Sequence, residues 1–171
     1  MRIQEKITIR ALEILELKQE RSLILDAGCG PGFASAYLRE IGHDVIALDI
    51  ISEFLSFYEI KELNPIVSDM SLTPFRQESF DAIVSISALQ WIYRDIENNM
   101  MKLNLVNLAQ SLFSVLKPKG RAILQFYPKN NDIMEEVGKI IAENTRFSGN
   151  FVIDNPNNPK KRHIFLLLKK E

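Results

Sequence analysis

A carboxylate and three closely spaced glycines follow the first strongly apolar run of the sequence. Residues 23–25 are apolar, Asp26 ends this run, and Gly28, Gly30 and Gly32 come at every second position after it. Such a run predicts a buried parallel strand, and glycines directly after a strand let the backbone turn sharply and approach a ligand without an intervening Cβ. The spacing predicts a nucleotide-binding turn, with a glycine-rich turn that binds no ligand as the alternative.

A second carboxylate, Asp49, stands where the ribose of a nucleotide would need it. It ends the next apolar run, 44–48, and lies about 17 residues beyond Gly32. In doubly wound sheets an acid at the end of the second strand accepts hydrogen bonds from ribose hydroxyls, and the ligand lies at the carboxyl ends of the strands. We therefore expect Asp49 to hold the ribose of a nucleotide cofactor.

The glycine spacing separates two cofactor classes. Dinucleotide-binding turns have the pattern G-x-G-x-x-G, which would require a glycine where this chain has Phe33. A pyrophosphate binds at a glycine-lined helix N-terminus and is repelled by a nearby anion, whereas the carboxylate of Asp26 can receive the cationic amino-acid end of S-adenosylmethionine. The turn therefore favours a methyl donor over NAD.

The size and composition of the chain are those of one enzyme domain. Its 171 residues fall within the range of a single domain, so we expect residues 1–171 to form one. The net charge of −1 gives no general attraction to nucleic acid, so RNA binding would depend on a local basic patch or an accessory protein. The chain has one cysteine, Cys29, which lies in the glycine turn. A single cysteine excludes an intrachain disulfide and a cysteine cluster for zinc. No metal site is predicted.

No segment of the sequence has the features that direct a protein to a membrane. No apolar stretch approaches the ~18 residues of a membrane span, and residues 1–20 are charged and helix-periodic, unlike a signal peptide. We expect a soluble intracellular protein that works in the cytoplasm, or in the nucleus if the source is a eukaryote.

Strand-like and helix-like segments alternate with short connections, which predicts an α/β fold. We expect a Rossmann-like, mostly parallel sheet of seven strands, with helices on both faces and an antiparallel hairpin at the C-terminal end. The predicted strands are 22–26, 44–49, 65–68, 80–86, 121–126, 150–154 and 163–168.

The helices are predicted from apolar periodicity and from residues that start or stop a helix. Ser52 is suited to cap one helix, and Asp132 with Glu135 has the spacing of a capping box. Pro118 and Gly120 are expected to stop the longest helix. The predicted helices are an amphipathic one that opens the chain, 32–40, 52–63, 98–116 and one from Asp132 onward.

Further candidate site residues follow the later strands at the same edge of the sheet. Asp69 and Met70 end the third strand, where an acid can meet the amino group of adenine and a methionine can pack on its ring. The other interpretation of Asp69 is a turn cap. Ser87 and Trp91 follow the fourth strand, where the transferable methyl is expected, and Tyr127 follows the fifth. Trp91 offers a flat face for a base, although a single tryptophan is also common in a core.

Longer blocks of the sequence resemble one enzyme family. The blocks ILDAGCGPG, SISALQW, SLFSVLKPKGRAILQFYPKN and FSGNFVIDNPN are similar to those of the eukaryotic S-adenosylmethionine-dependent guanine-N7 methyltransferases that modify small-subunit (18S) ribosomal RNA and assist ribosome assembly. The similarity covers almost the whole chain, and SISALQW and QFYPKN are its most selective parts. Relative to that family, we expect this chain to lack an N-terminal segment that closes over the cofactor and a basic C-terminal tail.

The resemblance implies a class I methyltransferase fold and roles for individual residues. Gln90, Trp91 and Tyr127 are implied to shape a guanine pocket as substrate-positioning residues. No general base is expected, because guanine N7 has a lone pair and no proton to lose, and positioning alone can supply roughly 7–11 kcal/mol at best. His43 and His163 are therefore expected to have surface roles. The predicted cofactor-binding residues are Asp26, Gly28, Cys29, Gly30, Asp49, Ile50, Asp69, Met70 and Ser87.

Ribosomal RNA, or a preribosomal particle, is the substrate that the resemblance implies. The strand that ends at Asp154 should run parallel to its neighbours, which places the following loop beside the methyl donor. Lys160, Lys161 and Arg162 in that loop, with Lys129, are the predicted RNA-binding residues, since cations neutralise phosphates without reading sequence. The alternative is a solvated turn.

The resemblance also implies a small zinc-binding adaptor protein as a partner. The segment from Pro65 to Ser68 is the expected edge strand of the sheet, and an exposed edge can pair with another strand. The alternative is that Pro65 and the shortness of the strand protect the edge.

Two other functions fit the same residues. A methyltransferase of a small metabolite would share the fold and the cofactor. A non-catalytic ribosome-assembly factor would keep the fold and bind preribosomal RNA or protein. The intact carboxylates Asp26 and Asp49 favour cofactor binding, which an RNA methyltransferase and a metabolite methyltransferase would both require.

Overall fold

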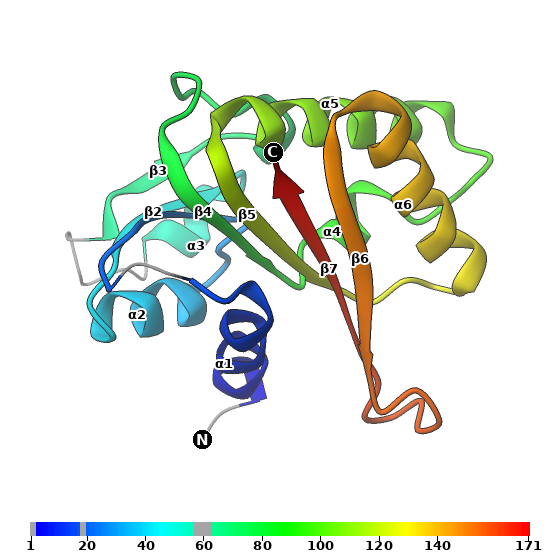
Figure 1. The fold of residues 1–171 in the computed structure, drawn as a ribbon, viewed down its shortest axis with the longest axis horizontal. Coiled ribbons are helices and arrows are strands. Elements are labelled where there is room, and N and C mark those ends of the chain that lie inside the picture. Colours follow the sequence, from blue (N-terminus) through cyan, green and yellow to red (C-terminus); the bar gives the residue numbers. More distant parts are fainter. Residues whose placement is uncertain (1–2, 18–19, 57–62) are drawn as a thin grey trace.

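The computed structural model describes residues 3–17, 20–56 and 63–171 and arranges them as one sheet between two layers of helices (Figure 1). The strands are β1 (Leu23–Ala27), β2 (Asp44–Asp49), β3 (Pro65–Val67), β4 (Phe80–Ile86), β5 (Leu116–Phe126), β6 (Phe147–Asp154) and β7 (His163–Lys170). The helices are α1 (Ile3–Leu15), α2 (Phe33–Glu40), α3 (Ser52–Leu55), α4 (Leu89–Ile92), α5 (Asn99–Val115) and α6 (Asn131–Asn144), with a 3-10 turn η2 (Met70–Leu72).

The strand order places the ends of β1 and β4 next to each other. Within the described residues the sheet has the order β3-β2-β1-β4-β5-β7-β6. The first five strands pair in parallel, and β7 is antiparallel to both β5 and β6. The prediction that the strand ending at Asp154 runs parallel to its neighbours is wrong, because β6 pairs with β7 and is antiparallel to it. β6 still runs in the direction of β5, so the loop after Asp154 lies at the carboxyl edge of the sheet. The fold class and the C-terminal hairpin agree with the prediction.

The predicted strand boundaries differ from the observed ones by one residue in β1 and β3 and by more in β5, β6 and β7. β5 begins at Leu116, which pairs with Phe80, so the strand passes through Pro118 and Gly120 instead of beginning after them. A register shift between Phe80 and Ala82 accommodates these residues as a bulge. β6 begins at Phe147 rather than at residue 150, and β7 continues to Lys170, because these two strands pair with each other over that length. Long-range pairing overrides local turn signals here.

Two predicted helix caps are wrong. Ser52 is the first residue of α3, not its cap, and its hydroxyl donates to the carboxylate of Glu53. α6 begins one residue before Asp132, because the side chain of Asn130 accepts the Ile133 amide at 2.9 Å. Of the helix predicted over 52–63, residues 57–62 lie outside the described part of the chain. The helix predicted over 98–116 is α5, which Asn98 caps.

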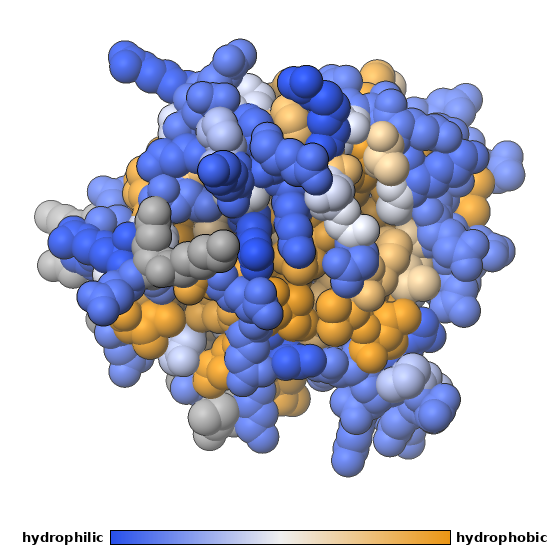
Figure 2. All heavy atoms as spheres, viewed as in Figure 1, coloured by the Kyte–Doolittle hydropathy of each residue, from blue (hydrophilic) through white to orange (hydrophobic). Residues whose placement is uncertain are grey.

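Apolar side chains cover both faces of the sheet. One buried cluster joins the sheet to α4, α5 and α6, with Phe80, Tyr93 and Phe126 fully buried. The other joins it to α1, α2 and α3 and includes Ala11 and Leu15. Seen from the side of Figure 1, polar residues form most of the surface, and apolar ones gather over β7 and β6 (Figure 2). On this side the helices therefore leave part of β6 and β7 uncovered.

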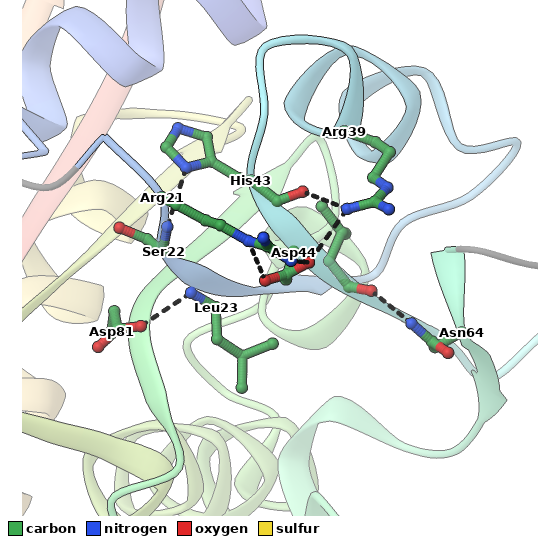
Figure 3. A network of polar contacts seen from close by, with 9 residues as sticks. Arg21, Ser22, Leu23, Arg39, His43, Asp44, Asn64 and Asp81 are labelled. Atoms are coloured by element: carbon green, nitrogen blue, oxygen red, sulfur yellow. Dashed lines mark hydrogen bonds and ion pairs between the residues drawn. The ribbon is translucent and has the colours of Figure 1, made fainter.

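A polar network closes the amino ends of β1 and β2 and includes His43 (Figure 3). Asp44 accepts hydrogen bonds from Arg21 at 2.8 and 2.9 Å and from Arg39 at 3.0 Å. The Nδ1 atom of His43 accepts the Ser22 amide at 3.2 Å, and His43 is only 7% exposed. The predicted surface role of His43 is therefore wrong, because its ring is buried and accepts a backbone hydrogen bond. This burial lowers the pKa of His43.

Candidate functional site

A cavity of about 710 Å³ opens at the carboxyl ends of β1, β2 and β4. This volume lies within the ~300–1,000 Å³ of small-molecule sites. Its wall consists of the glycine turn, the β2–α3 connection, the residues after β3 and β4, and Gln4 from α1. Every residue predicted to bind the cofactor lies in this wall: Asp26, Gly28, Cys29, Gly30, Asp49, Ile50, Asp69, Met70 and Ser87. The topology thus brings these residues together, and their roles remain predictions.

The glycine turn is tightly packed and uses its own amides. Gly28, Gly30 and Gly32 have φ angles of 74°, 51° and 87°, in the left-handed region that favours glycine. A Cβ on Gly28 would lie 2.5 Å from the Cβ of Ala88. The amides of Gly28 and Cys29 both donate to the carbonyl of Leu48, at 2.8 and 3.0 Å. Because these two donors bind the end of β2, the turn does not offer them to a pyrophosphate.

Asp49 is held in the cavity wall by backbone amides on both sides. Its Oδ2 atom accepts the Gly30 amide at 2.8 Å, and its Oδ1 atom accepts the Ile51 amide at 2.9 Å. The residue is 8% exposed. These bonds fix the orientation of the carboxylate, and each oxygen has a further lone pair that can accept a ribose hydroxyl.

Asp26 is the most deeply buried charge of the site. It is 0% exposed, and the hydroxyl of Ser35 donates to its Oδ2 atom at 2.5 Å. Its Oδ1 atom has no hydrogen-bond partner among the described residues. Burial raises the pKa of Asp26 to about 6, although the Ser35 hydrogen bond opposes this. A buried carboxylate with one unused oxygen in a cavity wall fits a ligand that brings a positive charge.

Asp69 both caps a turn and lines the cavity. Its Oδ1 atom accepts the amide and the hydroxyl of Ser71, each at 2.8 Å, at the start of η2. The turn-cap interpretation is therefore correct, and it does not exclude a role in binding, because Asp69 is also part of the wall. The side chain of Met70 beside it is buried against the glycine turn.

The charges in the wall are all of one sign. Asp26, Asp49 and Asp69 contribute carboxylates, and no described lining residue is Lys, Arg or His. An anionic ligand would be repelled from such a cavity, whereas a sulfonium or an ammonium group would be attracted. Among the described residues, no group of three or more His, Cys, Asp or Glu side chains could hold a metal ion.

The segment after β4 brings a strained residue and an exposed aromatic ring to the site. Ser87 has a φ of 59°, which is unusual for a residue with a side chain. Trp91 is 70% exposed and lines the cavity, so the alternative that it belongs to the core is wrong. Gln90 and Tyr127 lie next to the cavity without lining it. The Gln90 side chain donates to the Ser87 carbonyl at 2.8 Å and accepts the Tyr127 amide at 3.5 Å.

The predicted RNA-binding cations lie in and near the loop that follows β6. Lys129, Lys160 and Lys161 are exposed. Arg162 is less exposed, and its guanidinium donates to the side chain of Asn131 at the start of α6. His163, which is half-buried, places its ring edge against Tyr127, with the ring centroids 6.2 Å apart.

Several neighbours of the site carry no local signal in the sequence. Gln4 belongs to a helix that precedes the sheet and reaches the cavity only through packing. Ser35 lies one turn into α2, and its contact with Asp26 depends on how that helix returns along β1. Gln125 contacts Ser87 across the β4–β5 pair. The apolar character of residues 51 and 54 is visible in the sequence, but their place in the wall is not.

Within the described residues, no helix has both the length and the apolar character needed to cross a membrane.

Comparison with known proteins gives consistent matches. The model of the methyltransferase domain family matches residues 25–124. The chain is 41% identical over 159 residues to the 18S rRNA (guanine(1575)-N(7))-methyltransferase of Saccharomyces cerevisiae, covering 90% of this chain and 57% of the relative. It is 37% identical to the probable 18S rRNA (guanine-N(7))-methyltransferase of Dictyostelium discoideum, covering 97% of this chain and 60% of the relative. The chain thus spans less than two thirds of the length of these relatives.

Solved structures share the fold at low sequence identity. A protein from Pyrococcus horikoshii has a TM-score of 0.76 at 16% identity, with 99% of this chain and 93% of that chain covered. A Burkholderia thailandensis 1,6-didemethyltoxoflavin-N1-methyltransferase, solved with its substrate and S-adenosylhomocysteine, has a TM-score of 0.68 at 16% identity, covering 97% of this chain and 79% of that chain. These likenesses support the α/β architecture.

The buried carboxylate generates a first prediction, on stability. Because the folded state raises the pKa of Asp26 from 3.8 to about 6, stability falls as pH rises through that window, by up to about 3 kcal/mol. Asp26→Asn keeps an acceptor for Ser35 without the charge. We expect urea denaturation at pH 7 to show a more stable variant, with a difference that shrinks toward pH 4.

Asp44→Asn is the matched control for this experiment. Arg21 and Arg39 lower the pKa of Asp44, so its contribution to stability has the opposite sign and is lost as pH falls. The ion pairs are exposed, so the loss should be small. An Asp26→Asn variant that is less stable than the wild type at pH 7 would contradict the assignment of Asp26 as an uncompensated buried charge.

Proposed function

The chain belongs to the methyltransferase domain family, and we propose that it transfers the methyl group of S-adenosylmethionine to N7 of a guanine in small-subunit ribosomal RNA. S-adenosylmethionine, the methyl donor of this family, is the cofactor that the sequence predicts. The observation that carries the proposal is a cavity at the carboxyl edge of the sheet with three carboxylates and, among the described residues, no lining cation. The named activity of the two relatives supports guanine N7 of 18S rRNA as the target.

The residues of the cavity would divide the binding of the cofactor between them. Asp49 would accept the ribose hydroxyls, because backbone amides already orient its two oxygens. Asp69 and Met70 would contact the adenine, and Asp26 would compensate the positive charge of the amino-acid end. When bound, the cofactor supplies an electrophilic methyl group on a sulfonium. The chain then needs only to position the guanine, since its N7 lone pair attacks without losing a proton.

Gln90, Trp91 and Tyr127 would position the guanine. Trp91 is the exposed ring at the rim of the cavity, and a base can stack on it. Gln90 uses its amide to connect the ends of β4 and β5, so its role would be to fix the shape of the pocket rather than to read the base. Such an enzyme would act inside the cell, where ribosomal RNA is made and assembled.

Ribosomal RNA would approach over the loop after β6. The direction of β6 brings residues 155–162 to the carboxyl edge, where the cavity also opens. Lys160 and Lys161 are exposed there, and Arg162 is anchored to Asn131. Cations at the periphery can hold phosphates while the acidic cavity holds the cofactor.

The open edge of the sheet would receive the adaptor protein. β3 is an edge strand of the sheet and pairs only with β2 among the described strands. The Ser68 amide donates to the Asp49 carbonyl at 3.0 Å, so the alternation of a strand directs the Val67 amide toward the open side. Val67 and Leu72 are 58% and 68% exposed. An outward amide with apolar neighbours suits strand addition by a small zinc-binding partner.

The central test is methyl transfer itself. The protein is incubated with labelled S-adenosylmethionine and small ribosomal subunits, and the labelled base is mapped. We expect label at a guanine N7, and Asp49→Ala should weaken cofactor binding tenfold or more, because it removes charge-assisted hydrogen bonds worth about 1.5–3 kcal/mol. Asp44→Ala, at the opposite end of β2, is the control and should bind normally. Binding of NAD in place of S-adenosylmethionine would refute the proposed cofactor.

The same assay separates the other functions. Label in a small metabolite but not in RNA would favour a metabolite methyltransferase. Cofactor binding without transfer to any substrate, with or without the adaptor, would favour a non-catalytic assembly factor.

A third prediction concerns the loop cations. Replacing Lys160, Lys161 and Arg162 by serine should weaken RNA binding and flatten its salt dependence, by up to about 0.7 log unit per lost contact for a single strand. Calorimetry should show unchanged affinity for S-adenosylmethionine, because these side chains lie outside the cavity wall. An unchanged salt slope would remove the loop from the RNA path.

A fourth prediction concerns the sheet edge. Val67→Pro removes the outward amide and adds a residue that edge strands tolerate, so the fold should persist while the adaptor no longer binds. The measurement is light scattering after co-expression with the adaptor of the same organism. Ile41→Ser, which removes an exposed apolar side chain at the end of α2, is the control. A Val67→Pro variant that still forms the complex would place the adaptor elsewhere.

A further inference from the structure

A buried glutamine near the end of β5 stands out among the apolar residues of the sheet. Gln125 is 0% exposed and lies on the same side of β5 as Ile123, which belongs to the apolar cluster under α1. Its neighbours across the sheet are Ile86 and Phe165. Burying an amide in such surroundings costs free energy unless it is fully hydrogen-bonded. The Nε2 atom of Gln125 has no partner among the described residues, so stability alone does not explain this residue.

The other half of the Gln125 amide is used, and its partner is Ser87. The Ser87 hydroxyl donates to Oε1 of Gln125 at 2.9 Å, and the Ser87 amide donates to the Gln125 backbone carbonyl at 2.8 Å. Ser87 has a φ of 59°, a conformation that costs free energy for a residue with a Cβ. Gln125 therefore holds Ser87 by two hydrogen bonds in a conformation that Ser87 would not adopt by preference.

The conformation of Ser87 decides where one wall of the cavity lies. Ser87, Ala88 and Trp91 all line the cavity, and the chain bends at Ser87, directly after β4 ends. Ala88 packs directly on the glycine turn, so closely that a Cβ on Gly28 would clash with it. A rotation at Ser87 would move Ala88 away from the turn and Trp91 away from the rim. The contact between Gln125 and Ser87 thus helps to determine the shape of the cavity wall.

We propose that Gln125 is a positioning residue, which acts through the Ser87 hydroxyl to hold the wall formed by residues 87–91 against the bound cofactor. This inference rests on the proposed function, because it assumes that the cavity binds S-adenosylmethionine. Gln125 does not line the cavity, and its side chain acts on the ligand only through Ser87. Gln90 supports the same turn from the outside by donating to the Ser87 carbonyl.

The test is a double-mutant cycle in the full chain. Gln125→Met keeps the length of the side chain and removes the acceptor, and Ser87→Ala removes the donor. Each is expected to raise the dissociation constant of S-adenosylmethionine about tenfold. If Gln125 acts through Ser87, the double variant should bind no more weakly than the weaker single variant. Trp91, the one tryptophan of the chain, reports the wall directly, and its emission should change in Gln125→Met without ligand.

Thermal denaturation separates positioning from stability. Gln125→Met removes an unpartnered buried donor, so its melting temperature should stay close to that of the wild type while the affinity falls. Ser111→Ala is the control: it removes the hydroxyl that accepts the Thr73 amide, away from the cavity, and should change neither the affinity nor the Trp91 emission.

Two results would overturn the inference. Fully additive effects of Gln125→Met and Ser87→Ala on the dissociation constant would show that the two side chains act independently. An affinity loss that only parallels a loss of thermal stability would assign Gln125 a structural role. A wild-type protein that binds no S-adenosylmethionine would instead refute the proposed function, and this inference with it.

Discussion

The parallel pairing of β1 with β4 is the constraint on which the site depends. β2 and β3 lie on one side of this pair and β5, β7 and β6 on the other, so the connections that leave β1 and β4 diverge toward opposite faces of the sheet. A crevice forms between diverging connections at the carboxyl ends of the strands. Gly28 follows β1 and Ala88 follows β4, and their close approach closes the bottom of this crevice. Without a glycine at position 28 the two strand ends could not pack in this way.

The carboxylates of the crevice would favour a cationic ligand, and the burial of Asp26 lowers the stability of the free protein. Asp49 and Asp69 are compensated in part by backbone amides and Asp26 by Ser35, but one oxygen of Asp26 has no hydrogen-bond partner among the described residues. The free protein therefore carries an unfavourable interaction that a cationic ligand would relieve. Binding sites commonly retain such uncompensated groups, because the ligand restores what the fold leaves unsatisfied. Such a trade of stability for affinity would explain why β1 carries the carboxylate of Asp26, and not an apolar side chain, next to its last residue.

Local signals in the sequence identify about half of the residues in the cavity wall and only part of the fold. The glycine turn, Asp49 and Asp69 could be placed because each lies at or just after the end of a strand, and parallel strands bring such residues to one edge. His43 could not be placed, because its burial depends on the packing of the α2–β2 connection against Ser22. β5 begins earlier than Pro118 and Gly120 indicate, because pairing with Phe80 outweighs two local breakers. Ser35 and Gln125 carry no local signal, because only tertiary structure brings them to Asp26 and Ser87.

The proposed reaction must bring together two ligands of opposite charge, and the acidic and basic side chains lie at depths that would suit both. A methyl donor is cationic, and RNA is a polyanion that three carboxylates at the rim would repel. Asp26 and Asp49 are 0% and 8% exposed, so their charges lie deep in the cavity. The rim instead presents apolar groups, among them Trp91 and Ile50 at 70% and 64% exposure. The exposed lysines lie beyond it, in the loop after β6. Such a gradient from acidic to apolar to basic would admit a base toward the methyl group while its phosphates stay outside.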